Sequence, residues 1–254
     1  MPLLELSKVA KYFGKLQAVA DLDLKVEAGE VRSLIGPNGA GKTTVFNLIT
    51  GSLPPSSGSI VFNGEDITRL EPHVVAQKGI ARSFQQTFLF THLTALENVL
   101  IGFHMACRAG ALREFLHTRS AKKVDDECRL KALEIIEFMG LSGAAHELAA
   151  NLPHGHQRAL GVSMALACNP TLLLLDEPVT GMNPTETAEM VERIRKIRGS
   201  GVTVILVEHD MRVVMDVSDQ ITVLSYGSKI AEGLPAEIRD NKDVIQAYLG
   251  KEEL

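Results

Sequence analysis

The chain contains the stretch Gly36-Pro37-Asn38-Gly39-Ala40-Gly41-Lys42-Thr43-Thr44, which fits the pattern G-x-x-x-x-G-K-[ST] at every position. An apolar run precedes it at residues 31–35, and a segment with helical spacing follows it at residues 45–49. This order is strand, glycine-rich turn and helix. In such a turn the backbone N–H groups surround phosphate oxygens, and the N-terminus of the helix adds partial positive charge. The stretch therefore predicts a phosphate loop that binds a nucleotide.

Two side chains of this loop suit the charge of a nucleotide and its metal ion. Lys42 can reach the β- and γ-phosphates, and the hydroxyl of Thr43 can hold Mg²⁺. The alternative is an ordinary glycine-rich turn with a surface lysine, but the complete motif between a strand and a helix favours nucleotide binding. The candidate nucleotide contacts are Gly36, Pro37, Asn38, Gly39, Ala40, Gly41, Lys42, Thr43 and Thr44.

A second motif places two carboxylates at the end of a buried strand. Four leucines, residues 172–175, lead directly into Asp176 and Glu177. Charges at such a strand end are costly unless they serve a cation or accept hydrogen bonds. Beside a phosphate loop, Asp176 would hold Mg²⁺ opposite Thr43, and Glu177 would orient the attacking water and accept its proton. An acidic cap on a strand is the alternative for either carboxylate taken alone.

Two further polar residues follow predicted strands. His209 comes after the apolar run 202–207 and could contact the γ-phosphate, although a lone histidine is more often structural. Gln85 follows the predicted strand 79–84 and could ligate Mg²⁺ and contact the attacking water, although alone it would be only a polar loop residue. We therefore name Glu177, His209 and Gln85 as catalytic candidates, and Thr43, Gln85 and Asp176 as metal ligands.

Composition limits the class of protein. The 254 residues suffice for one large α/β domain or a core with a smaller lobe, and a hydrophobic fraction of 45% allows a proper core. The net charge of −5 argues against nucleic acid as the main partner. The three cysteines form no metal-binding pattern. No apolar run approaches the ~18 residues that a membrane span needs, so we expect any membrane association to depend on a partner.

The order of elements predicts an α/β fold. The N-terminal part is rich in strands, and from residue 155 onward strands alternate with helices, which predicts a largely parallel sheet covered on both faces. Between them, Thr94-Ala95-Leu96-Glu97 is a capping box that begins a helical region. We interpret residues 92–158 as a mostly helical insertion, which leaves residues 1–91 and 159–254 as the core lobe of one domain.

Taken together, these motifs resemble those of an ATP-binding cassette (ABC) ATPase over essentially the whole chain. The flanking stretches 35–47, 79–85, 207–214 and 243–250 are similar to those of the ATP-binding subunits of bacterial branched-chain amino acid importers. The resemblance implies a P-loop NTPase (RecA-like) core, with an antiparallel N-terminal sheet and an inserted helical subdomain. The segments that carry it are residues 36–43, Gln85, 152–158, Asp176-Glu177-Pro178, 181–184 and His209.

The resemblance also implies cofactors and partners. ATP and Mg²⁺ would lie between two subunits paired head to tail, the second being the same or a related chain. Phe13, with Tyr12 as the alternative, would stack on adenine. Two transmembrane permeases would be direct partners and a solute-binding protein an indirect one, at the cytoplasmic face of the inner membrane. The cluster of Phe88, Leu89 and Phe90 is either core or part of a groove for a permease helix.

One segment departs from the family pattern. The signature Leu-Ser-Gly-Gly-Gln, which would contact ATP from the opposite subunit, is replaced here by Leu152-Pro153-His154-Gly155-His156, followed by Gln157. Pro153 has neither the serine hydroxyl nor a backbone N–H to offer a phosphate. Gly155 and the helix N-terminus behind it can still face one. We therefore expect a weaker or differently made contact.

Other functions remain open at this stage. An importer ATPase could serve urea, amides or another small solute, because the ATPase does not touch the transported molecule. A soluble cassette ATPase acting on ribosomes or DNA is the second class, although such relatives resemble tandem cassettes or carry long coiled-coil insertions. A GTP switch protein is disfavoured, since Asn241-Lys242-Asp243-Val244 falls short of the guanine-reading Asn-Lys-x-Asp pattern.

Overall fold

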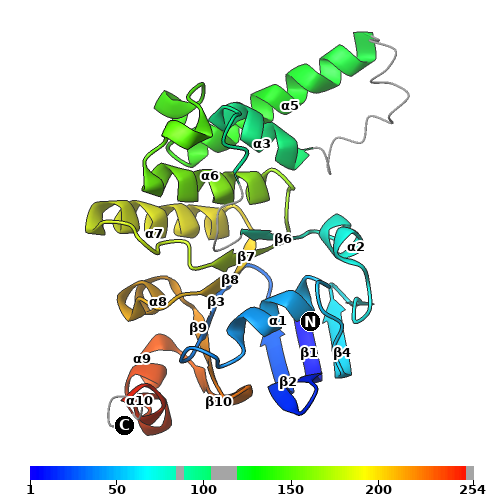
Figure 1. Ribbon diagram of the computed structural model, residues 1–254, viewed down its shortest axis with the longest axis vertical. Coiled ribbons are helices and arrows are strands. Elements are labelled where there is room, and N and C mark those ends of the chain that lie inside the picture. The colour runs from blue at the N-terminus through cyan, green and yellow to red at the C-terminus, as the bar shows by residue number, and fades with distance from the viewer. Residues whose placement is uncertain (84–88, 104–118, 250–254) are drawn as a thin grey trace.

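The computed structural model of the chain describes residues 1–83, 89–103 and 119–249 (Figure 1). Its centre is a six-stranded sheet in the order β10-β9-β3-β8-β7-β6. The pairs joining β9, β3, β8, β7 and β6 are all parallel, and only the edge strand β10 runs antiparallel to its neighbour. The strands are β3 (Val31–Ile35), β6 (Ile80–Ser83), β7 (Leu172–Asp176), β8 (Thr203–Val207), β9 (Gln220–Ser225) and β10 (Ser228–Gly233).

Both faces of this sheet are buried, which explains the unbroken apolar runs of β7 and β8. Successive side chains of a strand point to opposite faces. Accordingly, Leu172 and Leu174 pack into one core cluster, and Leu173 and Leu175 pack into another on the opposite face. The predicted parallel sheet with two covered faces is confirmed.

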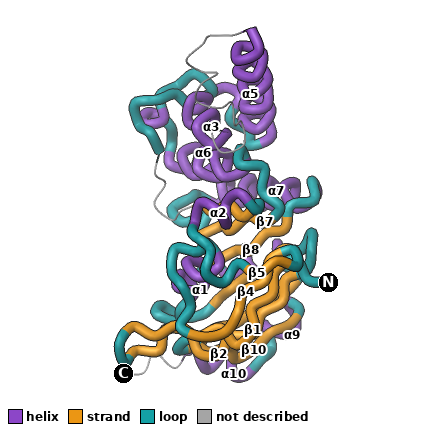
Figure 2. Tube along the Cα trace, turned by 90° about the vertical axis from the view of Figure 1, so that its right-hand side faces the viewer, coloured by secondary structure: helices purple, strands orange, loops and turns teal. Residues whose placement is uncertain are grey.

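The N-terminal strands form a second sheet that packs against helix α1 (Lys42–Ile49). Its order is β2-β1-β4-β5 and all its pairs are antiparallel. Figure 2 shows this sheet beside α1. Phe46 and Ile49 of the helix share one core cluster with residues of both sheets. The strands are β1 (Leu4–Phe13), β2 (Leu16–Val26), β4 (Ser57–Phe62) and β5 (Glu65–Asp66).

Helices α3, α5 and α6 gather above one end of the main sheet (Figure 1). The capping box is present as predicted, because the Thr94 hydroxyl accepts the Glu97 N–H at 3.2 Å and the Glu97 carboxylate accepts the Thr94 N–H at 2.7 Å. The boundaries 92 and 158 of the proposed insertion remain a prediction. The elements are α3 (Ala95–Phe103), α5 (Arg119–Phe138), α6 (His154–Leu166) and two short 3₁₀ turns, η1 (Ser142–Ala144) and η2 (Ala149–Asn151).

The remaining helices complete the covering of the sheet. Helix α7 begins with Asn183 as its cap and Glu186 in a reciprocal capping box. Short elements such as β10, α2 and α9 are not predicted from the sequence, because they carry too few apolar residues to show a period. The remaining helices are α2 (Pro72–Gln77), α7 (Pro184–Gly199), α8 (Met211–Val217), α9 (Pro235–Arg239) and α10 (Lys242–Leu249). Across the described residues, no helix is both long and apolar enough to cross a bilayer.

Candidate functional site

The candidate side chains converge because they follow parallel strands that end at the same edge of the sheet. The phosphate loop follows β3, Glu177 follows β7, and His209 lies two residues beyond β8. Strand register places Asp176 beside Val207, the last residue of β8. The carboxyl edge of a parallel sheet is where open α/β proteins bind their ligands. The topology thus brings three sequence-distant motifs to one place.

The phosphate loop is held in a conformation that needs glycine. Gly41 has φ = 101°, and a Cβ there would lie 2.5 Å from the carbonyl oxygen of Ala18. Gly36 has φ = 151°, and its Cβ would collide with the carbonyl of Leu224. Lys42 is buried, and its ammonium donates to the carbonyl oxygens of Gly36 at 2.6 Å and Pro37 at 3.0 Å. The Lys42 side chain therefore lies against the backbone of the phosphate loop.

A cavity of 640 Å³ opens in front of this loop. Its walls include residues 38–44, Glu177 and His209. Phe13, which is 47% exposed, and Tyr226 line the same cavity, so an aromatic ring is available beside the loop. Tyr12, the alternative adenine contact, is not among the lining residues. The role of Phe13 in adenine binding remains a prediction.

Glu177 is held in a defined orientation by its neighbours. Its backbone lies in the left-handed region at φ = 50°, a strained conformation for a non-glycine residue that is typical of functional sites. His209 Nε2 lies 2.9 Å from Glu177 Oε1, and the Thr180 hydroxyl donates to Oε2 at 3.2 Å. The two catalytic candidates therefore contact each other directly. Thr180 is a partner that the sequence analysis did not name.

Glu208 joins the loops that carry these two residues. It is buried, and its carboxylate accepts the backbone N–H of Val179 at 3.0 Å and that of His209 at 2.9 Å. Burial raises the pKa of Glu208 above its ordinary value and the Glu177 charge adds to this effect, whereas the backbone donors oppose it. One side chain thus ties the loop after β7 to the loop after β8. Its position next to His209 was the only hint in the sequence.

Asp176 forms a buried ion pair with a residue that the sequence analysis did not single out. The Arg82 guanidinium of β6 donates to Asp176 Oδ2 at 2.6 Å, and its other terminal nitrogen donates to Asn47 Oδ1 of α1 at 2.6 Å. The side chains of Arg82 and Asp176 are only 9% and 4% exposed. A signal did exist in the sequence, because an arginine next to Ile80 and Ala81 in a buried strand needs a polar or charged partner.

The residues proposed for a metal ion fit Mg²⁺ in their chemistry. Asp176 and Thr43 supply oxygen atoms, and Mg²⁺ is usually held by one or two carboxylates together with substrate phosphates and water. The structure brings both to the carboxyl edge of the sheet, Asp176 as the last residue of β7 and Thr43 in the first turn of α1. The third proposed ligand, Gln85, lies outside the described residues. Its assignment stays a prediction.

The altered signature segment begins helix α6 and packs against the start of α7. Pro153 is the N-cap residue of α6 and is exposed, as is His154, the first residue of the helix. A Cβ on the buried Gly155 would lie 2.6 Å from a carboxylate oxygen of Glu186. Leu152 is buried and its carbonyl accepts from the Gln157 amide at 2.9 Å, whereas His156 is half-buried. The exposed face of this segment belongs to Pro153 and His154.

Sequence comparisons identify the family. The ABC transporter family matches residues 19–180, and the branched-chain amino acid ATP-binding cassette transporter family matches residues 228–253. The chain is 43% identical to the high-affinity branched-chain amino acid transport ATP-binding protein BraF of Pseudomonas aeruginosa. It is 40% identical to LivG, the protein of the same description from Escherichia coli K12. In each case 98% of both chains is covered.

Comparisons with solved structures lead to the same family as the sequence comparisons. A nucleotide-free ATP-binding cassette from an ABC transporter superposes with a TM-score of 0.87 at 31% identity, covering 98% of this chain and 100% of that one. A cassette of an ABC transporter in its ADP conformation superposes with a TM-score of 0.86 at 30% identity, covering 98% and 99%. The match extends over both sheets and the helices, and it agrees with the P-loop ATPase fold expected from the sequence. The chain therefore belongs to the ABC transporter family, as one of its ATP-binding cassettes.

Proposed function

We propose that this chain is the ATP-hydrolysing subunit of an importer for branched-chain amino acids. One observation carries the proposal: the phosphate loop, Glu177 and His209 line a single cavity large enough for a nucleotide. The choice of solute rests on the relatives, which are described as branched-chain amino acid transport proteins, and on the family match at residues 228–253. Importers of urea, amides or other small solutes are the alternatives.

The geometry supports a division of labour in ATP hydrolysis. The loop N–H groups and Lys42 would bind the phosphates, and Lys42 would exchange its contacts with Gly36 and Pro37 for phosphate oxygens. Glu177 would orient the attacking water and accept its proton, while His209, which contacts Glu177, would donate to the γ-phosphate. Asp176 and Thr43 would hold Mg²⁺, which neutralises charge developing on the phosphate oxygens. Phe13 would stack on adenine.

The proposal includes a second ATPase subunit, either a copy of this chain or a related one. Phe13 in the wall of the cavity is half-exposed, and none of the signature residues 152–157 lines this cavity. In a head-to-tail pair, the segment of one subunit would close over the ATP of the other. Gly155 is buried against Glu186, so the contact would be made by the N-terminus of α6 at its exposed residues Pro153 and His154.

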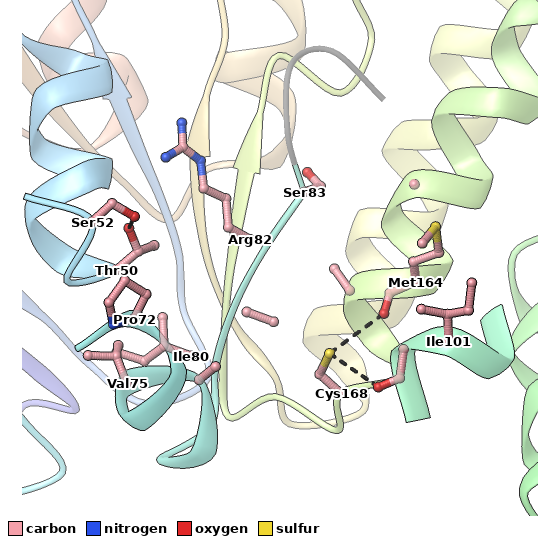
Figure 3. Close-up of a pocket in the computed structure, with 15 residues that line it drawn as sticks. Thr50, Ser52, Pro72, Val75, Ile80, Arg82, Ser83, Ile101, Met164 and Cys168 are labelled. Atoms are coloured by element: carbon pink, nitrogen blue, oxygen red, sulfur yellow. Dashed lines mark hydrogen bonds between the residues drawn. The ribbon is translucent and has the colours of Figure 1, made fainter. Parts of the chain in front are cut away.

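A groove between the core and the helices is the proposed contact with a permease. Its volume is 400 Å³, and Figure 3 shows its apolar wall. Val75 and Ile80 contribute from α2 and β6 on one side, and Ile101 and Met164 contribute from α3 and α6 on the other. Such a groove suits an amphipathic helix of a membrane partner. The subunit would thereby sit peripherally on the cytoplasmic face of the inner membrane and meet the solute-binding protein only indirectly. No nucleic acid partner is proposed.

The direct test is uptake into vesicles. The tagged chain is purified from its source cells with the membrane proteins that accompany it, and the complex is placed in vesicles loaded with ATP. We expect uptake of labelled leucine that depends on internal ATP and on the matching solute-binding protein. Leucine, isoleucine and valine should compete with the label. Competition by urea or amides alone would reassign the solute, and co-purification of ribosomes or DNA without membrane proteins would favour the second class of function.

Substitution of Ile101 by glutamate is expected to prevent the permease helix from binding in the groove. The new carboxylate would have to be desolvated against an apolar permease helix, which costs several kcal/mol. We expect the complex to lose its permeases and its uptake, while the intrinsic ATPase activity and the melting temperature of the isolated subunit persist.

The control variant is Leu130→Glu, because Leu130 is 62% exposed on α5 and does not line the groove. Gel filtration of the complex and vesicle uptake measure the effect. If Ile101→Glu lowers the melting temperature as much as it lowers uptake, the position serves packing and the groove assignment fails. Two members of the predicted cluster are described: Leu89 packs against the core cluster of the helices, whereas Phe90 is 50% exposed and is available for the same test.

Replacement of Pro153 by serine is expected to strengthen ATP-dependent pairing of subunits. Serine restores a hydroxyl donor, and a hydrogen bond to a charged group contributes ~1.5–3 kcal/mol, which corresponds to roughly a 10- to 100-fold tighter dimer. Light scattering with ATP, on a Glu177→Gln background that prevents hydrolysis, measures the dimer directly. Serine is also a better helix cap, so the melting temperature must be followed. The exposed Pro54 supplies a matched Pro54→Ser control. Unchanged dimerisation would remove Pro153 from the list of ATP contacts.

A further inference from the structure

Arg82 connects three parts of the protein that the proposed function uses. Arg82 belongs to strand β6 and is one of the residues that line the groove between the core and the helices. Its guanidinium bonds Asp176 at the end of β7 and Asn47 of helix α1. In Figure 3 the Arg82 side chain extends from β6 away from Ile101 and Met164, which form the opposite wall of the groove. Arg82, which lines the groove, therefore contacts Asp176, the carboxylate proposed to bind Mg²⁺.

The surroundings hold this guanidinium in one place. The carboxylate of Asp176 and the amide oxygen of Asn47 each accept at 2.6 Å, and the ring of Phe46 lies beneath the guanidinium carbon with its centroid at 5.4 Å. Charge-assisted hydrogen bonds of this length are among the strong ones in proteins, and the rigid fork of arginine fixes direction as well as distance. The contact with Phe46 adds a cation–π attraction. Arg82 is thus immobilised from three sides.

We propose that Arg82 is a positioning residue for the metal carboxylate: by holding Oδ2 of Asp176, it orients the side chain so that the remaining acceptor sites face the Mg²⁺ of bound ATP. A carboxylate has about four lone-pair sites, so one bond from arginine leaves capacity for a metal-bound water. Partners of this kind orient metal ligands and typically account for a 10- to 100-fold effect on metal affinity or activity. The inference rests on the proposed MgATP site and deepens it.

Two other roles for the pair make different predictions. If the pair only stabilised the fold, its loss would lower the melting temperature without a specific effect on metal binding. If Arg82 competed with Mg²⁺ for the carboxylate, its removal would tighten metal binding, because one positive charge close to the ion would disappear. The positioning role predicts weaker metal binding in spite of the lost repulsion. Metal affinity therefore separates the three roles by the sign of the change.

The experiment measures the binding of a fluorescent ATP analogue to the full chain in excess chelator and across a Mg²⁺ titration, on a Glu177→Gln background that blocks turnover. For Arg82→Met we expect unchanged affinity in chelator and an affinity in Mg²⁺ that is about 10- to 100-fold weaker than in the parent. Asn47→Ala keeps the arginine and removes one anchor, so we expect a smaller loss in the same direction. Arg82→Lys, which keeps the charge but not the fork, should fall between the parent and Arg82→Met.

The matched control is Arg239→Met, since Arg239 is an exposed arginine whose side chain pairs with the neighbouring Asp240. It should leave every affinity unchanged. Equal or tighter Mg²⁺-supported binding in Arg82→Met and in Asn47→Ala would overturn the proposal, and so would a parent whose affinity for the analogue does not respond to Mg²⁺. Failure of the proposed function itself would look different, because the chain with Glu177 intact would then show no Mg²⁺-dependent ATP hydrolysis.

Discussion

Replacing Glu177 by glutamine is expected to slow ATP hydrolysis about 10²- to 10⁴-fold while leaving ATP affinity close to that of the parent. Glutamine has nearly the same shape and can still accept from Thr180, so the loop after β7 should keep its conformation. It cannot accept the proton of the attacking water. The loss therefore falls on the chemical step and not on binding.

Steady-state hydrolysis and a nucleotide-binding titration on the same preparation measure the two quantities separately. Glu147→Gln is the matched control, since Glu147 is exposed and outside the cavity, and its activity should equal that of the parent. A Glu177→Gln chain that turns over normally would transfer the role of general base to another group. A chain that loses ATP affinity instead would show that Glu177 acts in binding.

Replacing Lys42 by methionine, in contrast, is expected to weaken ATP binding itself, by roughly 10- to 100-fold or more. A hydrogen bond to a charged group contributes ~1.5–3 kcal/mol, and Lys42 is predicted to make such bonds to two phosphates. The same change removes the two hydrogen bonds that Lys42 donates to Gly36 and Pro37, so the nucleotide-free loop should also become less rigid. Turnover should fall further, because the lysine would also stabilise charge in the transition state.

Titration with a fluorescent ATP analogue measures the affinity, and hydrogen exchange of the loop amides measures its rigidity. The exposed Lys196, on the last turn of α7, supplies the control Lys196→Met. Parent-like affinity in Lys42→Met would mean that the loop N–H groups alone bind the phosphates. Comparison with Glu177→Gln then separates residues that bind ATP from residues that act on the attacking water.

Helices and strands could be predicted from the sequence wherever the regular spacing of apolar residues extended over enough positions. The continuous leucines 172–175 predicted a strand covered on both faces, and β7 is buried throughout. The capping box at Thr94 begins its helix as expected, because a cap depends on side chains only three residues apart. Elements such as α2, β10 and α9 were not predicted, since five or six residues with mixed burial show no regular spacing of apolar side chains.

For the site, the sequence by itself determined the local chemistry: a glycine-rich loop with Lys42 and Thr43, and a strand ending in Asp176 and Glu177. These features are contiguous, so their backbone geometry follows from neighbouring residues. Only the tertiary structure decided which groups meet across the chain. Arg82 lies 94 residues from Asp176, and the contact exists because β6 and β7 pair in parallel and register places their ends together. Glu208 likewise reaches Val179 only because β7 and β8 are neighbours. The order and register of strands are set by packing of the whole core, which no local stretch encodes.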